Sequence, residues 1–211
     1  MILIVFLLTA LVGGTGAPLI KYAVGVLPPA TFVAIRAIVA LLVILPFVAA
    51  KLTQLPLPDK TLLLANLLFA TNWFLFAVGL EKTNVIMAQV IYVPTSLIVA
   101  AIGFVFLQEK LNKQQIQGLF LTMTGFLILI FGSFAPSSNL SLGNPIGNLL
   151  VVGGLISWAS YIVLTRKVSD KYPPGIILFY NFLATAIISP LILPLEPGNF
   201  QLALGSISAN T

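Results

Sequence analysis

The stretch NVIMAQVIYVPTSLIVAAIGFVFL, residues 84–107, decides the fold. It holds no charged residue and is bracketed by Glu81-Lys82 on one side and Glu109-Lys110 on the other. A helix of this length crosses about 30 Å of membrane hydrocarbon. The stretch therefore predicts a transmembrane helix.

The middle of this helix is polar and contains a proline. Pro94 removes one backbone hydrogen bond, and its ring clashes with the carbonyl group four residues back. Inside a membrane, a freed carbonyl group must be satisfied by protein, a hydroxyl group or water. Gln89, Tyr92, Thr95 and Ser96 lie close by in the sequence. We therefore expect a helix break at Pro94 that faces the protein interior or a wet cavity where a solute binds.

Composition places the whole chain in the membrane. Of its 211 residues, 59% are hydrophobic and 7% are charged, whereas soluble domains carry about 25% charged residues. The chain has no cysteine and no histidine, which excludes disulfides, thiolate and imidazole metal sites, and Ser-His-Asp catalysis. No metal and no other cofactor is expected. The net charge of +5 comes from basic residues at span ends, which favours contact with membrane lipid over nucleic acid.

Seven hydrophobic segments, joined by short connections, are long enough to span a membrane. We therefore expect an all-α fold, a polytopic transmembrane helix bundle. The predicted spans lie near residues 2–22, 31–50, 61–80, 84–107, 114–132, 146–165 and 175–195.

Basic residues are distributed unequally between the two sides of these spans. With a cytoplasmic N-terminus, seven lie on the cytoplasmic side, whereas Lys21 and Lys82 lie on the other side and Arg36 lies within a span. Cytoplasmic loops carry the excess of Lys and Arg in membrane proteins. We therefore expect a multi-pass protein of the plasma (cytoplasmic) membrane, with its N-terminus in the cytoplasm and Thr211 outside.

An offset of 145 residues indicates an internal repeat, because it places Pro28-Pro29 on Pro173-Pro174. The same offset aligns the first span with the sixth, the second with the seventh, and Arg36 with Asn181. Since five spans separate the copies, the second copy enters the membrane upside down. Inverted repeats of this kind are typical of secondary transporters, whose solute site lies near the membrane midplane.

Five segments, taken in order, carry a resemblance to a known family. They are GTGAPLIKY (14–22), Leu27-Pro28-Pro29 with Phe32 and Arg36, residues 83–111 with Pro94, residues 117–132 with their glycines, and residues 147–167 with Ser157-Trp158-Ala159. Together they resemble the EamA-type members of the drug/metabolite transporter (DMT) superfamily. Gln108 departs from that pattern, since the family usually has glycine before the following Glu.

The resemblance implies ten spans in two inverted five-helix repeats. On this basis, residues 1–133 form the first repeat and residues 145–211 form the first two helices of an incomplete second repeat. The fold would then be an inverted-repeat (5+5) transporter type. The implied function is a secondary transporter, an exporter of small metabolites, amino-acid-like or drug-like compounds, that works by alternating access.

A second class of function stays open at this point. The chain stops three spans short of the family's ten, which would suit a truncated, non-transporting membrane protein, or one completed as a homo-oligomer or by a partner chain. An intramembrane enzyme would need paired acids, a serine with a base, or metal ligands inside the spans, and the sequence has none. No Asp or Glu lies deep in a span, which disfavours a proton-relay drug pump.

Eight polar or aromatic residues are candidates for lining a substrate cavity: Arg36, Asn72, Trp73, Gln89, Tyr92, Trp158, Tyr161 and Asn181. Arg36 either snorkels to the membrane interface or faces the cavity and holds an anionic or zwitterionic group. Asn72 and Trp73 lie mid-span, in the core or on the cavity wall.

Spacing groups four of these candidates into two pairs. Gln89 and Tyr92 share one helix face, and so do Trp158 and Tyr161. For the second pair, hydrogen bonding between helices is the alternative to lining a cavity.

Gly13, Gly14 and Gly16 form a glycine-rich patch in the first span. A phosphate-binding loop would need a preceding strand, a following helix and usually Lys-Ser/Thr, and these are absent. We therefore expect the three glycines to allow close helix packing or local flexibility.

Overall fold

The computed structural model describes residues 2–52, 57–108, 110–133 and 142–195. Within these ranges the chain is all-helical, as expected, with eight α-helices and a short 3-10 helix, η1 (Leu193–Leu195). The α-helices are α1 (Ile2–Val26), α2 (Pro29–Leu52), α3 (Lys60–Lys82), α4 (Val85–Tyr92), α5 (Thr95–Leu107), α6 (Lys113–Ser133), α7 (Pro145–Val168) and α8 (Pro174–Ile192).

The helices begin and end close to the predicted span limits. Within the described ranges, four helices are long and apolar enough to cross a membrane: α2 (over Pro29–Ala49), α3, α7 and α8. The bent pair α4 and α5 makes a fifth if it is counted as one span. The full count of seven, which adds α1 and α6, stays a prediction, and so does the inverted repeat.

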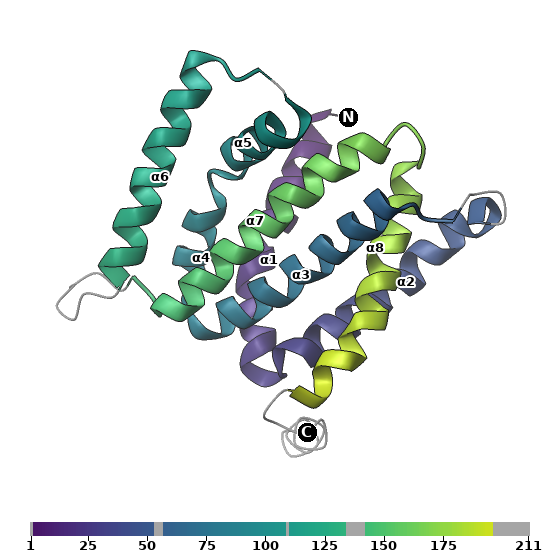
Figure 1. Ribbon diagram of the computed structural model, residues 1–211. Coiled ribbons are helices and arrows are strands. Elements are labelled where there is room, and N and C mark those ends of the chain that lie inside the picture. Colours follow the sequence, from purple (N-terminus) through teal and green to yellow (C-terminus); the bar gives the residue numbers. More distant parts are fainter. Residues whose placement is uncertain (1, 53–56, 109, 134–141, 196–211) are drawn as a thin grey trace.

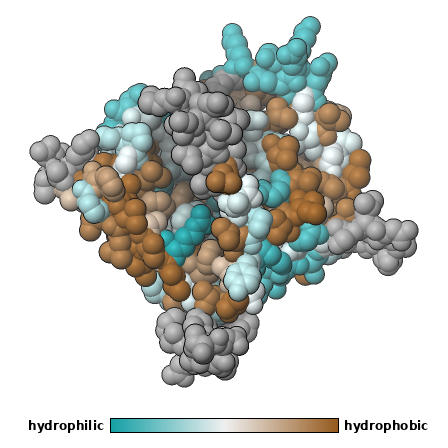
Figure 2. Space-filling model, turned by 180° about the vertical axis from the view of Figure 1, so that it is seen from behind, coloured by the Kyte–Doolittle hydropathy of each residue, from teal (hydrophilic) through white to brown (hydrophobic). Residues whose placement is uncertain are grey.

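Helices α3 and α7 make the most extensive contact and lie side by side in the middle of the bundle (Figure 1). Helices α2 and α8 pack on each other at one side, and α4, α5 and α6 lie at the other (Figure 1). Helix α1 contacts α2, α3 and α4. Much of the face in Figure 2 is apolar, with hydrophilic side chains gathered at the upper right, as suits a bundle surrounded by lipid.

The first end of the bundle, which we call the Lys82 end, holds a close contact between α3 and α7. A β-carbon built at Gly147 would lie 2.8 Å from the backbone nitrogen of Thr83 and 2.9 Å from the carbonyl oxygen of Gly79. The Thr83 hydroxyl group donates a hydrogen bond of 2.6 Å to Oδ1 of the buried Asn148. We call Gly79, Thr83, Gly147 and Asn148 the α3–α7 joint.

The opposite end, the Asp59 end, is closed by charged and hydroxyl groups. Asp59 caps α3 by accepting a hydrogen bond of 2.9 Å from the backbone N–H of Leu62, and it pairs with Lys171 at 3.1 Å. These two contacts, the first the stronger, lower the pKa of Asp59 below its ordinary value. The buried Tyr172 donates its hydroxyl hydrogen to the carbonyl oxygen of Leu57 at 3.1 Å. The loop between α7 and α8 is thereby tied to the start of α3.

The helix over residues 84–107 is interrupted at Pro94. Helix α4 ends at Tyr92, α5 begins at Thr95, and the two helices are bent by 42°. The Thr95 hydroxyl group donates a hydrogen bond to the carbonyl oxygen of Tyr92. A hydroxyl group therefore satisfies a backbone oxygen at the break, which is what the membrane environment requires.

Candidate functional site

A cavity of about 400 Å³ lies between α1, α2, α3, α4 and α7. Six of the eight predicted site residues line it, namely Arg36, Asn72, Trp73, Gln89, Tyr92 and Trp158. The apolar part of its wall comes from Ala17 and Ile20 of α1, Phe32 of α2, and Phe76 and Ala77 of α3. Among the described residues that line the cavity, none is acidic, and Arg36 alone carries a formal charge.

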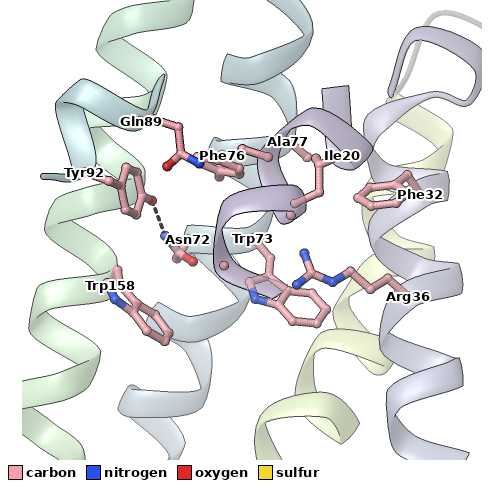
Figure 3. Close-up of a pocket in the computed structure, with 13 residues that line it drawn as sticks. Ile20, Phe32, Arg36, Asn72, Trp73, Phe76, Ala77, Gln89, Tyr92 and Trp158 are labelled. Carbon is pink, nitrogen blue, oxygen red and sulfur yellow. Dashed lines mark hydrogen bonds between the residues drawn. The ribbon is translucent and has the colours of Figure 1, made fainter. Parts of the chain in front are cut away.

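Arg36 reaches from α2 across to α3 (Figure 3). Its guanidinium carbon lies 3.9 Å from the centre of the Trp73 ring, a cation–π contact. Within the part of the chain that the structure describes, no carboxylate contacts this group. Stacking uses the face of the guanidinium plane, so the N–H groups at its edge are available to a ligand with a planar acid group.

Amide and hydroxyl groups lie opposite the arginine (Figure 3). The Asn72 amide group donates hydrogen bonds to the Tyr92 hydroxyl oxygen at 2.6 Å and to the Gly154 carbonyl oxygen at 2.9 Å. Since the Tyr92 hydroxyl group accepts from Asn72, its own hydrogen can be donated into the cavity. Gln89, one turn away on α4, is exposed to the cavity.

Gly154 leaves room for this network, a role that was not predicted from the sequence. A β-carbon built there would lie 3.0 Å from the Tyr92 hydroxyl oxygen and 3.6 Å from Nδ2 of Asn72. A signal existed in the sequence, because Gly154 lies about one turn before Trp158 on the same helix. A small residue next to a candidate site residue indicates that another side chain occupies the space.

Five aromatic rings close the cavity toward the Asp59 end. Phe69 lies at their centre, with ring centroids 4.9 Å from Trp73, 6.2 Å from Trp158, 5.3 Å from Tyr161 and 5.9 Å from Phe182. We call these five residues the aromatic cluster. The cavity-lining residues of α1, α2 and α3 come from the halves of these helices nearer the Lys82 end, except Gly13, which lies at the middle of α1. The cluster therefore forms the floor of the cavity.

Tyr161 and Asn181 do not line this cavity. The Asn181 amide group donates a hydrogen bond of 2.7 Å to the Tyr161 hydroxyl oxygen, which joins α8 to α7. Asn181 is fully buried, and its Oδ1 atom has no partner among the described residues. Tyr161 borders a second cavity of about 360 Å³ near the Asp59 end. Trp158 and Tyr161 thus lie one turn apart and face different cavities.

Comparison with known proteins identifies the family. The sequence profile of the EamA-like transporter family matches residues 1–131 and 145–209. The chain belongs to this family. This confirms the resemblance, to a family of membrane transporters.

Two curated relatives are similar to this EamA-family chain. The chain is 32% identical over 169 residues to "Uncharacterized transporter YyaM" of Bacillus subtilis (strain 168), covering 75% of this chain and 54% of that protein. It is 28% identical over 190 residues to an uncharacterized transporter of Haemophilus influenzae (strain ATCC 51907 / DSM 11121 / KW20 / Rd), covering 86% and 60%. The chain thus spans little more than half the length of these relatives. No solved structure matches it significantly.

The departure from the family pattern at Gln108 has a structural consequence. Gln108 follows α5 with a φ angle of 54°, and its backbone N–H bonds to the carbonyl oxygen of Gly103. Residues with a side chain rarely adopt this left-handed backbone conformation, whereas glycine adopts it readily. The glycine usual in the EamA family suits this turn better than the glutamine found here.

The glycine patch of α1 does not pack closely, so the first of its two expected roles, close helix packing, is wrong. A β-carbon built at Gly13, Gly14 or Gly16 would meet no atom within 4 Å. Gly13 and Gly16 instead line the cavity. These residues keep the α1 side of the cavity open.

Proposed function

We propose that this protein is a secondary transporter that exports small metabolites bearing an anionic group, amino-acid-like or drug-like in size, by alternating access. The observation that carries the proposal is the cavity in which Arg36 lies over Trp73 and faces the Asn72–Tyr92 pair. A site of this kind, mostly apolar with a few convergent polar groups, suits a small solute.

The distribution of basic residues supports an orientation for this cavity. Lys60, Arg166, Lys167 and Lys171 lie at the Asp59 end, whereas Lys21 and Lys82 lie at the other. Because the end richer in basic residues faces the cytoplasm, the Lys82 end faces outward and the N-terminus is cytoplasmic. The cavity then lies in the outer half of the membrane with the aromatic cluster beneath it. In the alternating-access cycle, these rings separate the solute from the cytoplasm.

The lining chemistry supports an acid over an amine as the solute. Arg36 offers charge-assisted hydrogen bonds to a carboxylate, and such bonds are about twice as strong as neutral ones. An organic cation would find no carboxylate on this wall, and arginine would repel it. The hydroxyl group of Tyr92 and the amide group of Gln89 can bind a second polar group of the solute.

The alternative function is a non-transporting membrane protein that needs a second copy or a partner chain. Such a protein would bind a solute in the cavity without moving it across the membrane.

The test is counterflow in proteoliposomes that hold the purified full chain and a panel of small carboxylic acids and their amine analogues. We expect exchange of acids, and at least a tenfold loss of apparent affinity in Arg36→Gln, since a charged hydrogen bond contributes about 1.5–3 kcal/mol. Lys82→Gln, which removes a charge outside the cavity, is the matched control. Equal affinity in Arg36→Gln at equal incorporation would refute the role of Arg36. Binding without exchange would favour the alternative.

A further inference from the structure

Helix α1 forms one wall of the cavity, and its glycines make no close contact with other helices. Gly13 and Gly16 line the cavity, and β-carbons built at these positions, or at Gly25, would meet no atom within 4 Å. In membrane bundles, small residues usually allow close contact between helices, and here they leave space instead. Some other interaction must fix the position of this wall.

Lys21 supplies such an interaction. Its ammonium group donates hydrogen bonds to three backbone carbonyl oxygens, those of Leu80 at 2.7 Å, Glu81 at 2.9 Å and Thr83 at 2.8 Å. A lysine ammonium group has three hydrogens, so its donor capacity is fully used. The last carbonyl groups of a helix lack intrahelical partners and favour a nearby cation, and Lys21 of α1 fills that place at the end of α3.

These bonds connect α1 to the α3–α7 joint. Thr83 belongs to the α3–α7 joint, where its hydroxyl group bonds to Asn148. Lys21 follows Ile20 and lies one turn from Ala17, and both of these neighbours line the cavity. The Lys21 side chain therefore links this end of α1 to the joint, beside the apolar packing of Ile20 and Val24 on α3.

We propose that Lys21 is a positioning residue that holds α1 against the end of α3 and so sets the width and solvent access of the cavity. The inference rests on the proposed function, in that the cavity is taken to be the solute site. Lys21 contacts the backbone oxygen of Glu81, so the carboxylate of Glu81 is not required. Loss of the three bonds lets this end of α1 move away from α3, which opens the cavity and weakens its contacts with a solute.

The test uses the absence of cysteine from the chain. Gly16→Cys is introduced on the cavity wall of the full chain in lipid nanodiscs, and its reaction with a water-soluble maleimide is followed by mass spectrometry. With Lys21→Met added, we expect the labelling rate to rise at least fivefold. Lys21→Arg, which keeps the charge and the donors, restores a rate close to that of the parent. Glu81→Gln and Lys82→Met change the charge at the same end and leave the rate unchanged.

An unchanged labelling rate in Lys21→Met, or a rise in Glu81→Gln as large as in Lys21→Met, would overturn the inference. If Lys21→Met does not yield folded protein, Lys21→Gln, which keeps an amide donor, is used and is expected to give an intermediate rate; a parental rate there would also overturn it. Labelling does not depend on transport. If Lys21→Met changes the labelling rate but no counterflow is found, the role of Lys21 stands and the proposed function is refuted. If counterflow is found but Lys21→Met does not change the labelling rate, the proposed function stands and the role of Lys21 is refuted.

Discussion

Glycine has opposite roles in the α3–α7 joint and in the α1 wall. In the joint, Gly79 lies against Gly147, and a β-carbon on either would approach within 3.0 Å of neighbouring atoms. In the wall, β-carbons at Gly13 and Gly16 would meet nothing within 4 Å. One set brings two helices together, and the other keeps a cavity open.

The role of a small residue therefore depends on the atoms that face it. Gly79 and Gly147 face each other across two long helices that pack along most of their length. Gly16 faces a cavity. A closely packed joint next to a wall with open space at its glycines allows one part to move relative to the other.

The two regions should differ most in the stability lost when a glycine is replaced by a larger residue. Gly147→Val should destabilise the protein by about 3 kcal/mol, because the added carbons overlap backbone atoms of α3 that cannot move independently. The same substitution at Gly14, where there is open space, should change stability by less than about 0.5 kcal/mol. Thermal unfolding of the purified proteins measures both. Similar losses at the two positions would contradict the comparison.

The buried hydrogen bond of the joint gives the next largest effect. Thr83→Val leaves Oδ1 of the buried Asn148 without its partner, which should cost about 1–3 kcal/mol. Thr124→Val on α6 removes a hydroxyl group that bonds within its own helix to the carbonyl oxygen of Phe120 and is exposed, so it should cost almost nothing. Chemical denaturation in mild detergent measures the two changes. If Thr83→Val costs no more than Thr124→Val, the joint is not held by this bond.

A third comparison tests whether glycine is favoured at a position because of its backbone conformation rather than because of close contact between helices. Gln108→Gly should stabilise the protein by about 1 kcal/mol, because the left-handed turn no longer carries a side chain. Gln117→Gly, at an exposed position within helix α6, should destabilise the protein by about 1 kcal/mol. The two melting temperatures should therefore shift in opposite directions. A shift in the same direction would remove the conformational explanation.

The smallest effect concerns pH and compares the two ends of the bundle. The pKa of Asp59 is lowered by its hydrogen bonds to Leu62 and Lys171, so its contribution to stability is present above the ordinary pKa and is lost as pH falls through the lowered value. The pKa of Lys171 is raised by its contacts with Tyr172 and Asp59, so its contribution is lost as pH rises through the raised value.

Melting temperatures measured from about pH 6 to about pH 3 test this prediction. Asp59→Asn, which keeps a helix-capping side chain, should flatten the decline. Thr83→Val, in the uncharged joint, should lower the whole curve without changing its slope. An equal slope in wild type and Asp59→Asn would show that the Asp59 end contributes no pH dependence.

The positions of the helices could be predicted from the sequence because hydropathy and proline act locally. The break at Pro94 is such a case, since the ring itself prevents the hydrogen bond. Arg36, Asn72 and Tyr92 could be selected because a polar group in mid-span needs a partner or a cavity.

The contacts of individual residues could not be predicted, because they depend on which atoms face one another across helices. Gly16 and Gly147 cannot be told apart from sequence, because the partner of Gly147 is about 65 residues away. Helical spacing predicts that Trp158 and Tyr161 share one face, and their rings stack with centroids 5.2 Å apart, yet they border different cavities. Asn181 aligns with Arg36 in the predicted repeat, but it lies outside the cavity and bonds to Tyr161.

The most direct test of the central claim uses the two tryptophans of the chain, Trp73 and Trp158, since both line the cavity. Intrinsic tryptophan fluorescence of the purified protein is titrated with small carboxylic acids and with their amine analogues. The account predicts a saturable change with one or more acids, no change with the amines, and loss of the change in Arg36→Gln but not in Lys82→Gln. An equal response to amines, or an unchanged response in Arg36→Gln, would contradict it.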